Sequence, residues 1–263
     1  MFFITVLGSG SAGNCALVET PKARLLIDAG LSARQTVERL ARCCINPLEI
    51  DAIILTHEHS DHSNALEVWC KKFQTPIYCN SLTAAEIRHR APTLQADFRL
   101  FLTGRPFEIK DLTIENFRVE HDAVDPLGFV LNHGTAALGF LTDLGFVTKL
   151  VRERIREVQT LVIETNYDEK LLNDDTKRPW PVKQRIKERH GHLSNSDAAN
   201  VVGELPGGRL RRAVLGHLSR DCNSPELALG AVRARLDAEG AHGIEVLCAT
   251  QREVTPRLAV AAA

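Results

Sequence analysis

Short apolar runs, each bounded by turn residues, recur along the first third of the chain. Runs of this length are typical of strands, and one of them, Ile50–Leu55, is apolar almost throughout, as in a strand buried on both faces. Helical spacing indicates helices from Ser32, as the N-cap, to Arg42 and from Asn64 to Phe73. We expect strands over Phe3–Leu7, Cys15–Glu19, Arg24–Ile27, Ile50–Leu55 and Pro76–Cys79.

The second half of the chain repeats this alternation. We expect strands over Leu112–Val119, Gly128–Asn132, Ala137–Leu141, Leu161–Glu164, Arg212–Leu215 and Ile244–Cys248, and helices over Asn195–Leu205 and Pro225–Glu239. The basic stretch Lys177–Pro181 is the one loop-like insertion, and we expect Ala259–Ala263 to be frayed. Strands that meet helices in both halves, without a linker or a repeat, predict an α/β fold in a single domain over residues 1–263.

Composition narrows the class of protein. The 263 residues are 44% hydrophobic and 25% charged, with a net charge of −1, so no global charge directs the chain to nucleic acid or to an anionic membrane. No apolar stretch reaches the roughly 20 residues needed to span a bilayer. Seven cysteines, an odd number without a Cys-x-x-Cys pair, predict reduced thiols and a cytoplasmic protein rather than a disulfide framework.

The densest group of polar residues follows the predicted strand Ile50–Leu55. It consists of His57-Glu58-His59-Ser60-Asp61-His62. Imidazole and carboxylate groups are ligands for zinc, iron or manganese. A His-x-His pair alone is as often a pair of surface histidines, but four ligand-type residues directly after a strand end favour a metal site. These four are His57, His59, Asp61 and His62.

This segment resembles the metal motif of the metallo-β-lactamase-fold hydrolases. That family has a four-layer αβ/βα sandwich with metals at one edge between two sheets, and its remaining ligands follow later strands. His121, Asp143 and His217 stand at the matching positions, each beside a predicted strand end. The resemblance implies one metal held by His57, His59 and His121, a second held by Asp61, His62 and His217, and Asp143 as the bridge between them.

The expected chemistry follows from this ligand set. Two divalent ions about 3.5–4 Å apart can share a hydroxide, lower its pKa and stabilise the charge on the attacked group. We therefore expect a hydrolase with two divalent metal ions that uses a metal-bridged hydroxide. All the proposed ligand atoms are nitrogen or oxygen, so zinc and manganese are both acceptable, and iron stays open.

Two further segments favour phosphodiesters as the substrate. The residues after His121 differ from the Gly-His-Thr-x-Gly type segment of lactamases and glyoxalase II-like thioesterases. Gly191-His192-Leu193-Ser194 resembles the His-Ser-Thr helix start of ribonuclease Z, whose histidine contacts the phosphate and can protonate the leaving oxygen. The resemblance implies His192 as the general acid; the alternative is a histidine that caps the following helix or packs beneath it. Asp61 is counted with His192 as a catalytic candidate.

The segment before His192 is locally basic. Such a strip can follow a phosphate backbone, and the aromatic ring of Trp180 can stack on a base. A solvated helix face explains the same pattern equally well, so both interpretations stay open. The cations are Lys177, Arg178, Lys183, Arg185, Lys187 and Arg189, with Glu188 as the acid among them.

Segments along the whole chain resemble one narrower group, the YycJ/WalJ-like (VicX) proteins. They run from the glycine turn Leu7–Cys15 through the metal motif to the segment that begins at His217. This group implies a cytoplasmic, metal-dependent nuclease with exonuclease action on DNA. Two departures stand out: Tyr167 occupies a position where we expect histidine, and Cys222-Asn223 one where we expect Asn-Asn. Neither belongs to the implied ligands.

The glycine turn also matches a dinucleotide-binding pattern. Gly8, Gly10 and Gly13 have Gly-x-Gly-x-x-Gly spacing after a strand, and Asp28 lies near the expected acidic position. That fold needs a helix directly after the glycines, whereas Cys15–Glu19 has a strand pattern. We expect a tight turn at the metal edge, with Asp28 structural or in support of a metal ligand.

The leading hypothesis is therefore a nuclease that cleaves nucleic acid, most of all DNA, exonucleolytically. A thioester or lactone hydrolase of the same fold and a non-catalytic metal-binding regulator are the alternatives. The sequence leaves open the preference for DNA or RNA, the polarity of cleavage and the oligomeric state.

Overall fold

Two seven-stranded sheets form the centre of the protein in a computed structural model, which describes residues 1–205 and 208–261. The first sheet has the order β14 (Leu258–Ala259), β1 (Phe3–Gly8), β2 (Cys15–Glu19), β3 (Arg24–Ile27), β4 (Ala52–Ile54), β5 (Ile77–Cys79) and β6 (Phe98–Leu100). The second has the order β13 (Glu245–Cys248), β12 (Arg212–Gly216), β11 (Thr160–Glu164), β10 (Ala136–Leu141), β9 (Leu127–His133), β8 (Leu112–Arg118) and β7 (Phe107–Ile109).

The two sheets share one plan. In each, the first strands along the chain pair antiparallel and the following ones pair parallel, with the change at β3 in the first sheet and at β10 in the second. The last strand of the chain, β14, pairs antiparallel with β1 at the edge of the first sheet. Parallel strands need crossover connections, and helices supply most of them here. Among the parallel strands, β4 and β11 are buried at every position, which explains their continuous apolar sequences.

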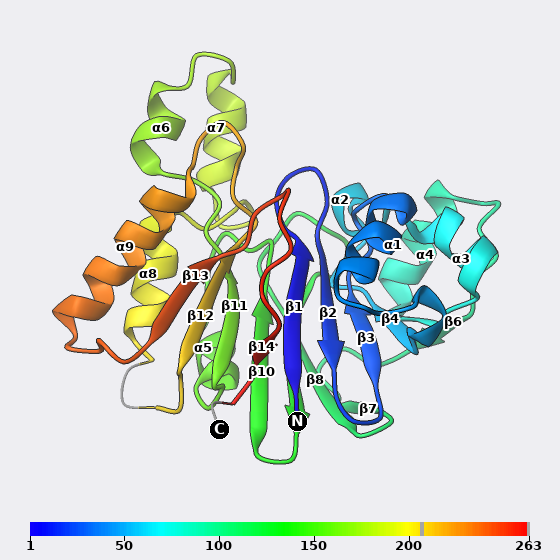
Figure 1. The fold of residues 1–263 in the computed structure, drawn as a ribbon. Helices are drawn as coiled ribbons and strands as arrows, with labels where there is room; N and C mark the ends of the chain where they lie inside the picture. The colour runs from blue at the N-terminus through cyan, green and yellow to red at the C-terminus, as the bar shows by residue number, and fades with distance from the viewer. Residues whose placement is uncertain (206–207, 262–263) are drawn as a thin grey trace.

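Helices cover the outer face of each sheet, so the molecule has four layers (Figure 1). The helices α1 (Ala33–Arg42), α3 (Leu66–Phe73) and α4 (Ser81–Arg90) pack on the first sheet, with Leu40, Trp69 and Ile87 in a shared core. The helices α5 (Lys149–Ile155), α8 (Asn195–Gly203) and α9 (Pro225–Ala238) pack on the second. A third core, which includes Ile54 and Phe129, fills the space between the two sheets.

Most of the expected elements are present within one or two residues of their expected ends. Ser32 caps α1 as predicted, with a capping box to Gln35. The polar motif is not a plain loop, because a short helix α2 (Ser60–Ser63) begins directly after His59 and precedes α3. The single-turn helix η1 (Pro47–Glu49) leads into β4.

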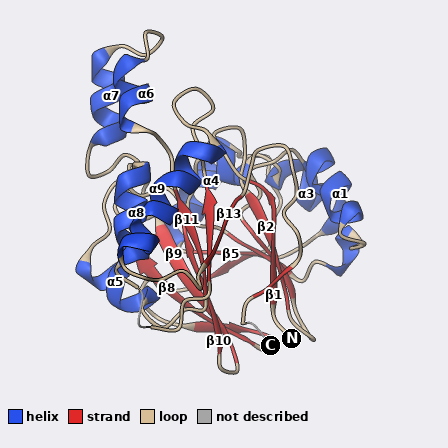
Figure 2. Ribbon diagram, turned by 60° about the vertical axis from the view of Figure 1, so that its left-hand side comes forward, coloured by secondary structure: helices blue, strands red, loops and turns tan. Residues whose placement is uncertain are grey.

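The insertion near Lys177 is larger than a loop. The helices α6 (Glu169–Asp174) and α7 (Trp180–Lys187), with the residues between them, form an arm that rises above the rest of the molecule (Figure 2). The prediction of a loop through Pro181 is therefore wrong at its end, because α7 begins at Trp180. The helix α6 buries one residue, Leu172, and α7 buries one, Lys183. Neither helix therefore has an apolar stripe from which the sequence could predict it.

The C-terminal segment also departs from expectation. Leu258 and Ala259 pair antiparallel with Ile4 and Phe3, and the amide of Val260 donates to the carbonyl of Phe2 at 2.9 Å, so the prediction of a frayed end is wrong at Ala259 and Val260. Residues 262–263 lie outside the described part. In the part of the chain that the structure describes, no helix has the length and apolarity to cross a membrane.

Candidate metal centre

Strands from both sheets deliver polar side chains to one edge of the sandwich. His57 follows β4, Asp143 follows β10 and His217 follows β12. The two sheets are tied at this edge, where the amide of Leu127 donates to the carbonyl of Thr56 at 3.0 Å. Asp143 and His217 both have a φ of 54°, in the left-handed region that few non-glycine residues adopt. Such outliers cluster at functional sites, where a sharp turn aims a side chain that regular strand geometry would not.

The first group of potential ligands joins His57, His59 and His121. Their ligand atoms all lie within 4.8 Å of one another. The ring of His57 lies 4.6 Å from that of His59 and 5.2 Å from that of His121 between centroids. His59 stands at the start of α2, and His121 belongs to the loop after β8, so two sheets and a helix start contribute to the group.

Hydrogen bonds fix which nitrogen of each ring faces this group. Thr56 Oγ1 donates to the Asp28 carboxylate, so its oxygen can accept the Nδ1–H of His57 at 3.0 Å. Nδ1 of His121 lies 3.0 Å from the carbonyl of Gly191, which can only accept. Both rings therefore carry their proton on Nδ1, and both Nε2 lone pairs are available to a metal ion.

The second group joins Asp61, His62, Asp143 and His217, whose ligand atoms also lie within 4.8 Å of one another. Nε2 of His217 lies 3.4 Å from Asp61 Oδ2, and Nε2 of His62 lies 3.0 Å from Asp143 Oδ2. His62 donates Nδ1–H to Asp28 at 2.8 Å, so Asp28 supports this histidine as expected. Asp143 reaches both groups, since its Oδ1 lies 3.8 Å from His121 Nε2.

Three buried atoms at the junction of the two groups have no hydrogen-bond partner among the described residues. They are His57 Nε2, His121 Nε2 and Asp143 Oδ2, the last of which lies 3.0 Å from His62 Nε2 but not in hydrogen-bond geometry. A buried polar atom without a partner costs about 1–3 kcal/mol, and proteins rarely leave three together. All three can donate an electron pair, so a divalent metal ion fits this set.

The electrostatics of the two groups differ. Burial, with the neighbouring His62 ring, lowers the pKa of His57 well below its usual range, so this ring is neutral. In the second group burial also lowers the pKa of His217, but Asp143, Asp61 and Glu164 outweigh it and hold the pKa at about 10. The carboxylates of the second group therefore favour a positive charge among them. A divalent cation can supply that charge when it displaces the protons of the histidines.

Glu58, in the centre of the polar motif, does not join either group. Its Oε1 accepts the amide of Val124 at 3.1 Å, so it ties the motif to the loop that carries His121. Glu164 is the residue that sequence reasoning missed. It is fully buried, and its Oε1 lies 2.7 Å from Nδ1 of His192 and 2.7 Å from Nδ1 of His217.

Glu164 holds these two histidines because its other oxygen is fixed as well. Its Oε2 accepts the amides of Leu144 at 3.0 Å and Leu193 at 3.2 Å. Burial raises the pKa of Glu164, but the rings of His192 and His217 outweigh burial and lower the pKa to about 2. An acidic residue at the end of an apolar strand, as at Asp143, was the available signal in the sequence.

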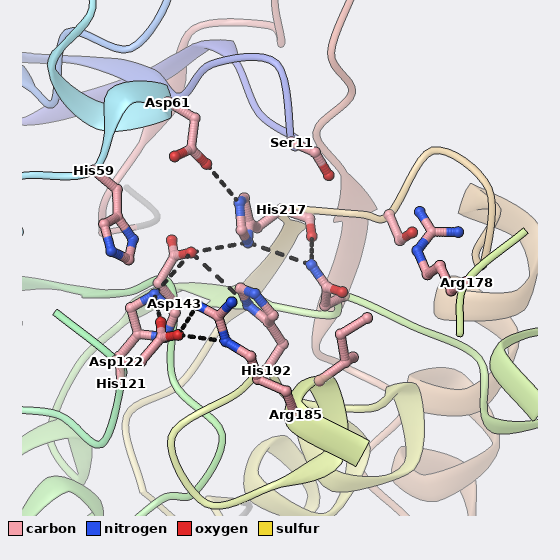
Figure 3. Close-up of a pocket in the computed structure, with 13 residues that line it drawn as sticks. Ser11, His59, Asp61, His121, Asp122, Asp143, Arg178, Arg185, His192 and His217 are labelled. Carbon is pink, nitrogen blue, oxygen red and sulfur yellow. Dashed lines mark hydrogen bonds and ion pairs between the residues drawn. The ribbon is translucent and has the colours of Figure 1, made fainter. Parts of the chain in front are cut away.

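His192 stands at the wall of a cavity of about 230 Å³ above both groups (Figure 3). Its Nδ1 donates to Glu164, so Nε2 is on the opposite edge of the ring, and the side chain is 22% exposed. Ser194, not His192, caps α8, which removes the capping alternative. The lining residues are Ser11, His59, Asp61, His121, Asp122, Asp143, Asn166, Arg178, Arg185, Ile186, His192, His217 and Ser219.

The basic strip is largely neutralised by nearby carboxylates. Lys177 and Arg178 pair with Asp221, at 3.1 and 3.2 Å. Lys183 is buried and donates to a backbone carbonyl. Further along, Arg185 pairs with Asp122 and Arg189 with Glu120. Trp180 is 62% exposed at the start of α7. The strip is thus neither a free positive surface nor a plain solvated face, and its contact with nucleic acid stays a prediction.

Comparison with known proteins agrees with this architecture. Residues 23–218 match the family model described as "Beta-lactamase superfamily domain". "Exodeoxyribonuclease YycJ" of Bacillus anthracis is 33% identical over 237 residues, which cover 90% of this chain and 89% of the relative. "Exodeoxyribonuclease WalJ" of Streptococcus pneumoniae is 35% identical, over 86% of this chain and 85% of the relative.

Solved structures show the same fold. The metallo-β-lactamase fold protein YhfI of Bacillus subtilis superimposes with a TM-score of 0.75 and 16% identity, covering 97% of this chain and 98% of the other. The short form of human tRNase Z superimposes with a TM-score of 0.66 and 18% identity, covering 99% of each chain. These likenesses confirm the predicted four-layer fold. The chain therefore belongs to the β-lactamase superfamily, in the group of YycJ and WalJ that its motifs indicated.

Proposed function

We propose that this protein is a metal-dependent phosphodiesterase that cleaves nucleic acid, with DNA as the substrate and exonucleolytic action. The observation that carries the proposal is His192, held by Glu164 at the wall of the cavity that lies over two groups of potential metal ligands. The names of the relatives YycJ and WalJ support exonuclease action on DNA. A cytoplasmic location and the choice of zinc or manganese belong to the same proposal.

The ligand assignment is part of the proposal. One ion would be held by His57, His59 and His121, the other by Asp61, His62 and His217, with Asp143 shared between them. When bound, a pair of divalent ions activates water for attack and neutralises charge that develops on phosphorus. The protein's part is to fix the ligands: Asp28, Thr56 and the Gly191 carbonyl set the orientation of three histidine rings.

His192 is proposed to supply the proton that the departing oxygen needs. Burial lowers the pKa of His192, but the Glu164 carboxylate outweighs burial and raises the pKa above the usual histidine value. The ring therefore holds a proton on Nε2 near neutral pH while Nδ1–H remains bonded to Glu164. A proton at this atom, at the cavity wall, can pass to the alkoxide oxygen that leaves phosphorus. Asp61, with 25% of its side chain exposed at the cavity, is proposed as the second catalytic candidate.

A single set of reactions tests this proposal. Metal-free protein is incubated with end-labelled DNA, RNA and a thioester, and zinc or manganese is added back separately. We expect mononucleotide release from DNA after addition of metal, and none before it. The variants His59→Ala and Asp143→Ala should lose this activity, whereas His89→Ala, at an exposed histidine in α4, should keep it. Turnover of the thioester alone, or full activity of Asp143→Ala, contradicts the proposal.

A further inference from the structure

The wall of the cavity above the ligand groups carries both carboxylates and arginines. Asp61, Asp122 and Asp143 contribute the carboxylates. Arg178 and Arg185 are the two arginines among the lining residues. A phosphodiester brings a further negative charge, so a cation with unused hydrogen-bond donors beside the phosphate would strengthen its binding. The two arginines differ in whether such donors remain.

Arg178 pairs with two carboxylates that do not line the cavity. Its Nη1 lies 2.6 Å from Asp175 Oδ2, and its Nη2 lies 3.2 Å from Asp221 Oδ2. Both terminal nitrogens are thus engaged with separate carboxylates, and the side chain is 26% exposed. These contacts hold the loop between α6 and α7 against the segment around Asp221. The carboxylates of Asp175 and Asp221 therefore balance the positive charge of Arg178.

Arg185 keeps half of its guanidinium free. Nε donates to Asp122 Oδ2 at 2.8 Å, and Nη2 donates to the same oxygen. Both bonds use one edge of the group, and among the described residues Nη1, on the opposite edge, donates to no other residue. The side chain is 72% exposed and lines the cavity. A guanidinium presents two donors on each such edge, in a geometry that matches two oxygens of a phosphate.

Asp122 fixes Arg185 beside the first ligand group. The other oxygen of Asp122, Oδ1, lies 3.4 Å from Nε2 of His121, the atom that faces the space between the ligands. Arg185 is thus separated from that atom by one carboxylate. In Figure 3 the guanidinium of Arg185 lies beside Asp122. The ring of His192 lies 5.2 Å from that of His121 between centroids, so Arg185, through Asp122, and His192 both neighbour His121 at the wall of the cavity.

We propose that Arg185 binds the substrate: its free edge holds a non-bridging oxygen of the phosphodiester that is cleaved, while Asp122 keeps the guanidinium in position. This inference rests on the phosphodiesterase function proposed above. The inference also assigns a function to the arm, because Arg185 lies on α7, which is part of an insertion outside the two sheets. The rest of the basic strip plays no part in it.

Three variants separate this role from a general effect of charge. Arg185→Gln removes the cation, Arg185→Lys keeps a charge without the paired donors, and Lys187→Gln removes an exposed cation from the same helix. Each is assayed with DNA and with bis(4-nitrophenyl) phosphate, which has a single phosphodiester. The metal content of each variant is measured alongside. A second measurement follows the binding of labelled DNA to metal-free protein in chelator, at several salt concentrations.

We expect Arg185→Gln to lower kcat/KM about 10- to 100-fold for both substrates, the loss typical of a charge-assisted hydrogen bond. Arg185→Lys should fall between this variant and the wild type, and Lys187→Gln should stay within about twofold for bis(4-nitrophenyl) phosphate, which has no flanking phosphates. In the binding measurement Arg185→Gln should bind DNA more weakly and should reduce the slope of log affinity against log salt by about 1.

The inference is overturned if Arg185→Gln retains wild-type kcat/KM on both substrates. It is also overturned if the activity of this variant, divided by its metal content, equals that of the wild type. The second result would mean that the Arg185–Asp122 pair only holds the His121 loop in place. A loss on DNA but not on bis(4-nitrophenyl) phosphate would place Arg185 at a flanking phosphate and also contradict the inference as stated. If the wild type hydrolyses neither phosphodiester, the proposed function fails instead.

Discussion

Replacing Glu164 by glutamine should weaken metal binding at the group that contains His217 and leave the group of His57, His59 and His121 unchanged. The carboxylate is fully buried and accepts four hydrogen bonds, two on each oxygen. The amide nitrogen of glutamine cannot accept, so whichever way the amide turns, two buried donors face another donor. Either the two histidine Nδ1–H groups or the two backbone amides of Leu144 and Leu193 lose their partner.

The magnitude follows from this count. Breaking a buried, charged contact by changing one partner costs about 3–5 kcal/mol, so the free energy of unfolding of the metal-free protein should fall by about 3 kcal/mol or more. Loss of the group that orients a metal-binding histidine lowers metal affinity about 10- to 100-fold. That loss should fall on the group that contains His217, while the group of His57, His59 and His121 keeps its affinity.

Two assays check this prediction. Urea unfolding of metal-free protein measures stability, and competition with a chromophoric chelator measures the affinity of each metal equivalent. Glu67→Gln, at a side chain that is 44% exposed, is the control and should change both by little. If Glu164→Gln binds both equivalents as tightly as the wild type, the orienting role is refuted, even where stability falls.

The pH dependence has a definite sign. The pKa of Glu164 lies at about 2 in the folded protein, below the ordinary value of 4.5, because the rings of His192 and His217 outweigh burial. A lowered carboxyl pKa stabilises the fold above the unfolded value and loses that effect as the pH falls. The difference in unfolding free energy between wild type and Glu164→Gln should therefore shrink as the pH falls from about 4.5 toward 2.

Three further predictions concern the rest of the molecule. His192→Ala should lower turnover on DNA about 100-fold or more with unchanged metal content, measured by single-turnover kinetics and metal analysis; equal turnover would remove His192 as the acid. Gly30→Ala should destabilise the protein by about 1–3 kcal/mol in urea unfolding and weaken metal binding, because a Cβ there would lie 1.5 Å from the Asp61 carbonyl oxygen. Gly230→Ala, in α9 with nothing within 4 Å, is the control and should be neutral or stabilising. In native protein a thiol reagent should modify the exposed Cys44 first, and four buried thiols should react only after unfolding; fast reaction of all seven would contradict the core packing. The four are Cys15, Cys70, Cys79 and Cys222.

The elements that the sequence predicts correctly are those with a strong pattern. The continuous apolar runs that became β4 and β11 lie in the parallel parts of the sheets, where both faces are buried. The elements that escaped prediction have weak patterns. The buried residues of α4 are Thr83, Ala84 and Ile87, which make no clear apolar stripe, and β6 is an edge strand with exposed side chains.

The sequence by itself determined the chemistry available at the site. His57, His59, Asp61 and His62 are neighbours along the chain, directly after a buried strand, so their proximity needs no long-range contact. The motifs around His121, Asp143 and His217 extended this set through resemblance, and the structure brings all seven residues together. Covalent spacing and strand pattern are local properties, which is why they can be taken from the sequence.

Only the tertiary structure decided what surrounds those residues. Glu164 meets His192 and His217 across 28 and 53 positions of sequence, and Arg185 meets Asp122 across 63. These contacts depend on the order of strands in the second sheet and on where the arm leaves it, since no local pattern tells which of these residues become partners. Hydrogen-bond partners and free donor edges are properties of packing, and packing is what decides which histidine nitrogen donates, which is left without a partner, and which arginine keeps unused donors.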